Sequence, residues 1–118
     1  MSSRNKEVIA KVNDAFARGD VEGFLSYCAE DFVWTMVGHE RFDGKAAVRE
    51  WMGRGPADPP QFTVDTLVAE GDHVCVVGNM TMDEKGEAVP YAYCDVWRIR
   101  DGKLAELRAF VVEIKAQD

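Results

Sequence analysis

Apolar residues in the first part of the chain recur with the spacing of an amphipathic helix. Ser3 is the predicted N-cap of this helix, and Gly19, which readily adopts a left-handed conformation, predicts its end. The positions of the apolar stripe share the i, i+4, i+7 spacing of one helix face and are Val8, Ile9, Val12, Ala15 and Phe16.

Between residues 20 and 60 the pattern changes several times, which predicts short elements. Asp20 is placed to cap a second helix, and residues 32–37 are rich in the β-branched and aromatic residues typical of a strand. In chain order we expect a helix from Val21 to about Cys28, a break at Ala29-Glu30-Asp31, a strand over Phe32–Val37, a polar loop from Gly38 to Asp43, a helix from about Gly44 to Met52, and a Gly- and Pro-rich segment over 53–60 that cannot continue it.

The rest of the chain reads as antiparallel strands with clear turn signals between them. Asp101-Gly102 is a strong hairpin signal, because both central residues of such a turn favour positive φ. Helices followed by a meander predict an α+β fold in which the helices cover one face of the sheet. At 118 residues the chain is expected to form one domain over residues 1–118. The expected strands are about Gln61–Ala69, His73–Asp83, Ala88–Arg100 and Lys103–Ile114.

Charge and composition narrow the expected partners. Fourteen basic and twenty-one acidic residues give a net charge of −7, which argues against binding to nucleic acid or to anionic membrane surfaces. Cys28, Cys75 and Cys94 are odd in number and lack CxxC spacing, so they indicate small buried residues in a reducing compartment, not a metal site or disulfide framework. The polar N-terminus lacks the core of a signal peptide, and no apolar run approaches the ~20 residues that span a bilayer. We therefore expect a cytoplasmic protein.

Alternation along the two long central strands sorts their side chains into faces. In the strand over 73–83, one face is apolar throughout and carries Val74, Val76, Gly78, Met80 and Met82. In the strand over 88–100, one face is apolar and aromatic except for a single carboxylate and carries Val89, Tyr91, Tyr93, Asp95, Trp97 and Ile99. A buried carboxylate must be hydrogen-bonded or neutralised. We interpret Asp95 as facing the interior, as a functional acid or a structural hydrogen bonder; the alternative is an exposed outer face.

Several segments, taken with their order and spacing, carry a resemblance to known proteins. They are Ala15–Gly23, Ala29–Asp31, Gly44–Trp51, Tyr93–Lys103 and Glu106–Ala109. With them the chain resembles the SnoaL-like branch of the nuclear transport factor 2-like superfamily, which includes ketosteroid isomerases and polyketide cyclases. The resemblance implies a cone-shaped, cystatin-like fold: a strongly curved, mostly antiparallel sheet with three N-terminal helices in its concavity. It also implies a homodimer through the outer face of the sheet, and no cofactor is expected.

The same resemblance implies roles for individual positions. It places Asp95 where ketosteroid isomerases hold the protonated carboxylic acid of their oxyanion hole, an acid kept neutral by apolar surroundings. The positions that it places on the pocket wall are Phe16, Trp51, Met80, Met82 and Val111.

Other catalytic positions of these relatives are not kept. The isomerase's oxyanion tyrosine aligns with Val12, and its catalytic base aligns with Thr35 or Met36. Ala109 takes the place of the acidic residue that cyclases use on their last strand, and the Asp-Arg-Asp relay of related epoxide hydrolases is not found. The chain therefore lacks the full set of catalytic residues for each of these activities, and the resemblance does not assign any of them.

The resemblance implies a pocket for a small, mostly apolar, carbonyl-containing molecule. Asp95 is the predicted proton donor, and His39 is a candidate partner because the pKa of an ordinary histidine suits proton transfer at neutral pH. The alternative for His39 is a solvated loop residue. No metal site is expected, because His39 and His73 lie far apart without carboxylates at ligand spacing. Core packing or water-facing hydroxyl groups are the alternatives for the remaining predicted pocket residues, which are Trp34, Met36, Tyr91, Tyr93 and Trp97.

Two functions from different classes follow from these predictions. The first is a cofactor-independent isomerase, cyclase or dehydratase that uses Asp95 as its acid. The second is a non-catalytic ligand-binding or dimeric scaffold domain, in which Asp95 is a structural hydrogen bonder.

Overall fold

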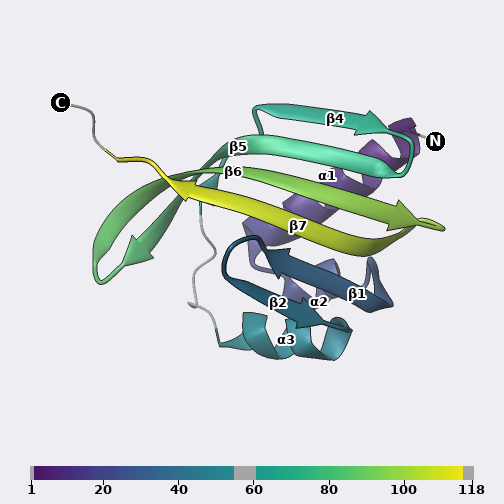
Figure 1. Ribbon diagram of the computed structural model, residues 1–118, viewed down its shortest axis with the longest axis horizontal. Coiled ribbons are helices and arrows are strands. Elements are labelled where there is room, and N and C mark those ends of the chain that lie inside the picture. The colour runs from purple at the N-terminus through teal and green to yellow at the C-terminus, as the bar shows by residue number, and fades with distance from the viewer. Residues whose placement is uncertain (1, 55–60, 116–118) are drawn as a thin grey trace.

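A curved sheet with helices on one side forms the protein (Figure 1). The computed structural model describes residues 2–54 and 61–115. The helices are α1 (Ser2–Arg18), α2 (Val21–Leu25) and α3 (Lys45–Gly53). The strands are β1 (Cys28–Met36), β2 (Glu40–Asp43), β3 (Gln61–Phe62), β4 (Thr66–Glu70), β5 (His73–Glu84), β6 (Glu87–Arg100) and β7 (Lys103–Glu113).

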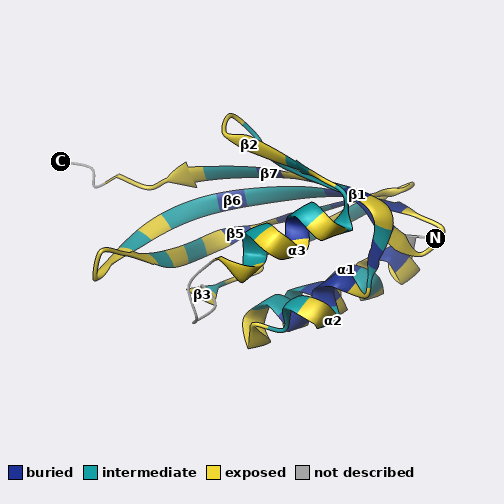
Figure 2. Ribbon diagram, turned by 90° about the horizontal axis from the view of Figure 1, so that it is seen from below, coloured by how far each residue is buried: buried dark blue, intermediate teal, exposed yellow. Residues whose placement is uncertain are grey.

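The sheet is mixed, and its strand order is β2-β1-β7-β6-β5-β3, with β4 also paired to β5. Neighbouring strands are antiparallel except for β1 and β7, which run parallel. The sheet bends over the helices, which lie on its concave side (Figure 2). The predicted α+β fold, with a curved and mostly antiparallel sheet around three helices, is therefore confirmed.

Local sequence signals account for several element boundaries. Gly19, with a φ of 68°, ends α1, and the Asp20 carboxylate accepts a hydrogen bond of 2.9 Å from the amide of Gly23 to cap α2. Asp101 and Gly102 both have positive φ, at 52° and 77°, and make the tight turn between β6 and β7. These predictions are confirmed.

The N-terminal elements differ from prediction in three places. The first helix begins at Ser2, so Ser3 lies inside it and is not its N-cap. The second helix ends at Leu25, and β1 begins at Cys28 instead of residue 32. The reason is long-range pairing: Cys28 lies opposite Leu104 of β7, whose amide donates a 2.8 Å hydrogen bond to the carbonyl of Tyr27. Pairing with β7 therefore holds in a strand the residues that were expected to form a break.

The polar segment 38–43 and the first predicted strand of the meander also differ from prediction. Residues 40–43 form β2, paired antiparallel to β1, instead of a loop. Residues 61–69 form two short strands, β3 and β4, which both pair with β5 and are separated by Thr63, Val64 and Asp65. The predicted Gly- and Pro-rich break at 53–60 lies mostly outside the described residues.

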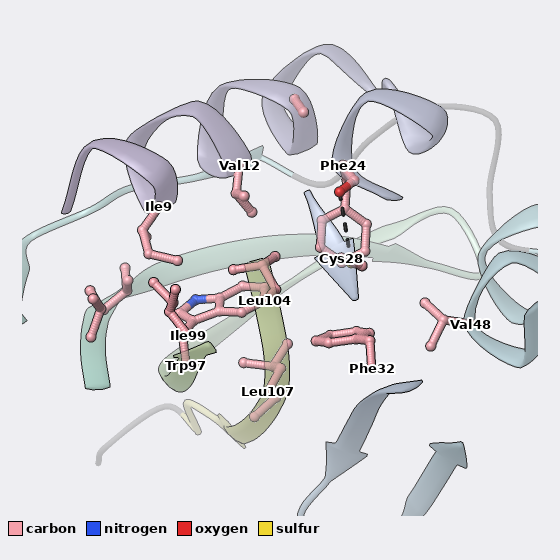
Figure 3. Packing of buried hydrophobic residues seen from close by; sticks show 14 of the residues in the cluster. Ile9, Val12, Phe24, Cys28, Phe32, Val48, Trp97, Ile99, Leu104 and Leu107 are labelled. Carbon is pink, nitrogen blue, oxygen red and sulfur yellow. Dashed lines mark hydrogen bonds between the residues drawn. The ribbon is translucent and has the colours of Figure 1, made fainter. Parts of the chain in front are cut away.

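The core lies between the concave face of the sheet and helices α1 and α2. Trp97 of β6 is fully buried at its centre, beneath Ile9 and Val12 of α1 (Figure 3). The ring centroids of Phe24 and Phe32 lie 6.2 and 6.4 Å from that of Trp97. Each such side chain contributes about 1.5–3 kcal/mol through burial. Half-buried apolar residues, among them Phe16, Trp34 and Met80, pack against this core.

Candidate functional site

Asp95 faces the concave side of the sheet, as the alternation predicted. Its cross-strand neighbours are Val76 of β5 and Ala109 of β7, and its neighbours on the same face of β6 are Tyr93 and Trp97. All four are buried, with exposed fractions of 0% to 7%. Asp95 itself is half-buried. Because every immediate neighbour on that face is covered, the carboxyl group reaches solvent only through the concavity.

The surroundings of Asp95 change its protonation. Burial raises the pKa of its carboxyl group from 3.8 to about 7. Among the described residues, none makes a hydrogen bond with this side chain, and no charged group compensates for its desolvation. Near neutral pH the group therefore populates a protonated form, which donates a hydrogen bond, and an ionised form, which only accepts.

Half-buried apolar residues from several elements surround the open part of the concavity. They pack against the core without being fully covered. Among the predicted pocket residues, those in this position are Phe16 of α1, Trp34 and Met36 of β1, Met80 of β5 and Val111 of β7. Trp51 of α3 is also half-buried. Trp97 is instead fully buried and supports this wall from below. Val12 is also fully buried, and its aliphatic side chain has no hydrogen-bond donor.

Trp34 is held by other aromatic rings. Its ring centroid lies 5.0 Å from that of Trp51 in an edge-to-face contact, and 6.2 and 5.9 Å from those of Phe16 and Phe24. Its indole Nε1 donates a 3.0 Å hydrogen bond to Sδ of Met36, two residues along the same strand face. The polar edge of Trp34 therefore points along the concave face toward Met36.

The two tyrosines on β6 already have hydrogen-bond acceptors. The hydroxyl of Tyr93 donates to the carbonyl of Thr63 over 2.7 Å, and burial raises the pKa of Tyr93 to about 12. The hydroxyl of Tyr91 donates to the carboxylate of Glu84 near the β5–β6 turn, at 2.8 and 3.0 Å from its two oxygens, which raises the pKa of Tyr91. Both hydroxyls are therefore structural donors in this conformation.

The close approach of Thr63 to β5 explains a glycine in the concave face. A Cβ on Gly78 would collide with the carbonyl oxygen of Thr63 and press on the ring of Tyr93. Gly78 thus allows residues 63–65 to cross the strand closely enough for the hydroxyl of Tyr93 to reach its acceptor.

In the part of the chain that the structure describes, no second acid–base group is hydrogen-bonded to Asp95. His39 is exposed in the β1–β2 turn, where its backbone amide donates to the carbonyl of Met36, and no hydrogen bond joins it to Asp95. Thr35 pairs with Arg108 and so faces the outer side, while Ala109 presents only a methyl group beside Asp95. Met82 lies six residues beyond Val76 on β5, about 20 Å along the strand from the Asp95 row.

Sequence reasoning missed two aromatic residues that shape the site. Phe42 of β2 stacks on Trp51 with ring centroids 4.5 Å apart. Phe62 of β3 meets Tyr93 edge to face at 6.5 Å. Phe42 is a lone apolar residue in a segment that was assigned to a loop, and its alternation with Arg41 and Asp43 was the signal that could have revealed a strand.

A hollow that involves only described residues lies at the β3–β5 edge. Its volume is about 230 Å³, and it is lined by Gln61, Phe62, Thr63, Asn79, Met80 and Thr81. This is below the ~300–1,000 Å³ of common ligand pockets.

Within residues 2–54 and 61–115, no group of three or more His, Cys, Asp or Glu residues is arranged to hold a metal ion. No helix in the described part of the chain is both long and apolar enough to span a membrane.

Comparison with known proteins decides the family. The model of the SnoaL-like domain matches residues 9–107 of this chain. The chain belongs to the SnoaL-like domain family. No match was found among functionally curated proteins.

Solved structures share the fold of this SnoaL-like chain at low sequence identity. A candidate ketosteroid isomerase from Kribbella flavida DSM 17836 is 22% identical, with a TM-score of 0.84 over 99% of this chain and 84% of that one. An NTF2-like protein of unknown function from Burkholderia pseudomallei K96243 is 22% identical, with a TM-score of 0.84 over 92% and 90%. A candidate polyketide cyclase from Xanthomonas campestris pv. campestris is 20% identical, with a TM-score of 0.83 over 92% and 90%. At this identity the likeness establishes the NTF2-like fold, and activity is argued from the site.

Proposed function

We propose that this protein binds a small, mostly apolar carbonyl compound in its concavity, with the Asp95 carboxylic acid donating a hydrogen bond to the carbonyl oxygen. The observation that carries this proposal is a carboxyl group set among apolar and aromatic residues of the concave face, with all four of its sheet neighbours buried. An apolar wall binds the body of such a ligand, and one convergent polar group fixes its orientation. The isomerase-like and cyclase-like solved structures agree with this ligand class.

A neutral acid at this position also supports one kind of chemistry. When a proton leaves the carbon next to a carbonyl group, negative charge develops on the carbonyl oxygen, and a hydrogen bond from Asp95 stabilises that charge more than it stabilises the neutral ketone. Isomerase, cyclase and dehydratase reactions share this step. Asp95 would supply the stabilising donor, and the carbon-bound proton would pass to solvent or to a group on the ligand.

A binding domain without catalysis is the second candidate, and one observation favours it. His39, the predicted partner, is exposed and makes no hydrogen bond with Asp95. Ala109 lies opposite Asp95 in the sheet and Met36 lies opposite Ala109, and neither side chain can accept a proton. A carboxylic acid alone orients a ligand without removing a proton from carbon. The two candidates therefore differ in whether a bound ketone exchanges its α-protons.

The first experiment measures binding of 1-indanone by calorimetry at pH 6 and pH 8, with the hydrocarbon indane as a control of the same shape. We expect the ketone to bind about ten-fold more tightly at pH 6, because only the protonated acid donates to a carbonyl oxygen and its pKa is about 7. In Asp95→Asn, whose side chain does not titrate, the affinity should be the same at both pH values. Equal affinity of the wild type for ketone and hydrocarbon would reject the proposal.

The second experiment separates enzyme from binder. The C2 protons of 1-indanone exchange with D2O through the enol, and NMR follows their loss. An enzyme of the proposed kind accelerates this exchange, and Asp95→Asn slows it; a binding domain leaves the exchange at the rate of the buffer. A mass-spectrometric search for a compound retained through purification would identify the natural ligand directly.

We also propose that the outer face of the sheet pairs two copies of the chain, as the family resemblance implied. Val68, Val77 and Val112 on this face are 55%, 42% and 64% exposed. The half-buried Cys94 and Phe110 lie in the same cross-strand row as Val77 and extend this apolar surface. Exposed apolar surface on a sheet face is typical of an interaction site.

A further inference from the structure

Trp34 has a hydrogen-bond donor that is only weakly used. Its Nε1 donates to the thioether sulfur of Met36 at 3.0 Å, and thioether sulfur is among the weakest acceptors in proteins. Both residues are half-buried on the concave face. An indole N–H in an apolar wall, paired with so weak an acceptor, will exchange it for an oxygen when one is offered.

The two partners differ in their freedom to move. The indole of Trp34 is packed against Trp51, Phe24 and Phe16, with ring centroids 5.0, 5.9 and 6.2 Å away. Met36 is unbranched with three rotatable side-chain bonds, and such side chains adapt easily. An arriving oxygen therefore displaces Met36 Sδ and meets an N–H whose direction is already fixed.

The sheet register brings this donor to the same part of the concavity as Asp95. Met36 lies opposite Ala109 of β7, and Ala109 lies opposite Asp95 of β6. The three residues form one row across the sheet, with the Cα atoms of Met36 and Asp95 about 10 Å apart at ordinary strand spacing. Ala109 contributes only a methyl group between them. A ligand that reaches Asp95 from the apolar wall therefore lies between Asp95 and the Trp34–Met36 pair.

We propose that Trp34 is the second hydrogen-bond donor of this site, and that the ligand carbonyl oxygen that accepts from Asp95 also replaces the sulfur of Met36 on the indole Nε1 of Trp34. This inference rests on the proposed function, because it concerns the ligand that Asp95 binds. It also supplies a donor from β1 where Val12 on α1 offers none. The substrate class narrows accordingly to apolar molecules whose carbonyl oxygen accepts from both β6 and β1.

The test follows the tryptophan indole signals in 1H–15N spectra during titration with 1-indanone. Trp34→Phe and Trp51→Phe assign the signals. We expect the Trp34 indole proton to move saturably with the ketone, and to stay in place with indane, which has no oxygen. In the free protein, Met36→Leu should already shift this signal, because it removes the sulfur acceptor and keeps the apolar volume.

Binding affinities give an independent readout. Trp34→Phe keeps an aromatic ring and removes the N–H, and should weaken 1-indanone binding about three- to ten-fold, the usual worth of one neutral hydrogen bond. Met36→Leu should tighten binding about two- to five-fold, because the indole N–H of Trp34 then has no hydrogen bond to Met36 that must break before it donates to the ligand. A purely structural role of Trp34 predicts no gain from Met36→Leu. Tyr27→Phe, which removes a polar hydrogen at the α2–β1 junction, is the matched control and should leave the affinity unchanged.

The outcomes separate this inference from the function on which it rests. If 1-indanone binds with the pH dependence expected of Asp95 but the Trp34 signal stays fixed and Met36→Leu does not tighten binding, the inference is wrong and the proposed function stands. If the ketone binds no better than indane at any pH, both are wrong. Should Trp34→Phe fail to fold, the spectra of the wild type and Met36→Leu still decide.

Discussion

Replacing Asp95 by asparagine should make the folded protein more stable at alkaline pH. The folded chain holds the Asp95 proton up to about pH 7, whereas the unfolded chain releases it near pH 3.8. The free energy of unfolding of the wild type therefore falls as the pH rises through this interval, and the loss from this group levels off above it. Asparagine has a similar shape and never ionises, so its folded state escapes this loss.

The magnitude follows from the two pKa values. One pKa unit corresponds to about 1.4 kcal/mol, so raising the pKa from 3.8 to about 7 sets an upper limit of about 4 kcal/mol for the cost of ionised Asp95. Asp95 is half-buried, and solvent that reaches it through the concavity screens the charge. We therefore expect about 2 kcal/mol, which is a large part of the ~5–15 kcal/mol that stabilises a typical domain.

Urea unfolding at pH 4 and pH 8, followed by tryptophan fluorescence, measures this difference. The free energy of unfolding of Asp95→Asn should exceed that of the wild type by about 2 kcal/mol at pH 8 and by less than about 1 kcal/mol at pH 4. Asp83→Asn, the same substitution at an exposed position on β5, is the control and should change the free energy of unfolding by less than about 0.5 kcal/mol. A gap between Asp95→Asn and the wild type that is equal at both pH values would refute the reasoning, because the carboxyl group would then ionise as freely in the folded protein as in the unfolded chain.

Three further substitutions test other parts of the structure. Gly78→Ala should lower the free energy of unfolding by about 2 kcal/mol in urea titrations, because the added methyl group collides with the carbonyl of Thr63; an unchanged midpoint would mean that the 63–65 segment moves aside freely. Tyr93→Phe removes a 2.7 Å hydrogen bond to the same carbonyl, and should cost about 1 kcal/mol in the same assay. Val112→Glu places a charge on the exposed outer face, and should convert a dimer into a folded monomer by light scattering at micromolar concentration; a wild type that is already monomeric would contradict the proposed pairing.

Features that depend on local sequence were predictable. The alternation of β5 and β6 is set by neighbouring residues and by tight turns such as Asp101-Gly102, so the residues that share a face with Asp95 were predictable. The apolar character of that face favoured the concave side, with the outer side left as the alternative. The Trp34–Met36 contact also had a local signal, because residues two apart in a strand share a face.

Features that depend on distant segments were not predictable in the same way. Nothing near residues 28–31 indicates that β7 will hold them in a strand. The alternation around Phe42 hints at the strand β2, but it does not indicate that this strand pairs with β1. The hydroxyl of Tyr93 donates to the carbonyl of Thr63, thirty residues away. The hydrophobic periodicity and strand propensity of the sequence around Tyr93 do not reveal this hydrogen bond. The candidate site was thus predicted as a set of residues facing one side, without the long-range contact that occupies the hydroxyl of Tyr93.

The central place of β7 in the sheet has a consequence for the order of folding. β7 lies between β1 and β6, so it alone joins the β1–β2 hairpin to the β4–β6 meander within the sheet. On the ribosome, β1 must wait about 75 residues for its parallel partner, and such non-local pairing slows folding. Until β7 arrives, β1 and β6 each present an unsatisfied edge that can recruit another nascent chain. Shortening the β6–β7 turn or cutting the chain before β7 would therefore promote aggregation more than similar changes at the β5–β6 hairpin.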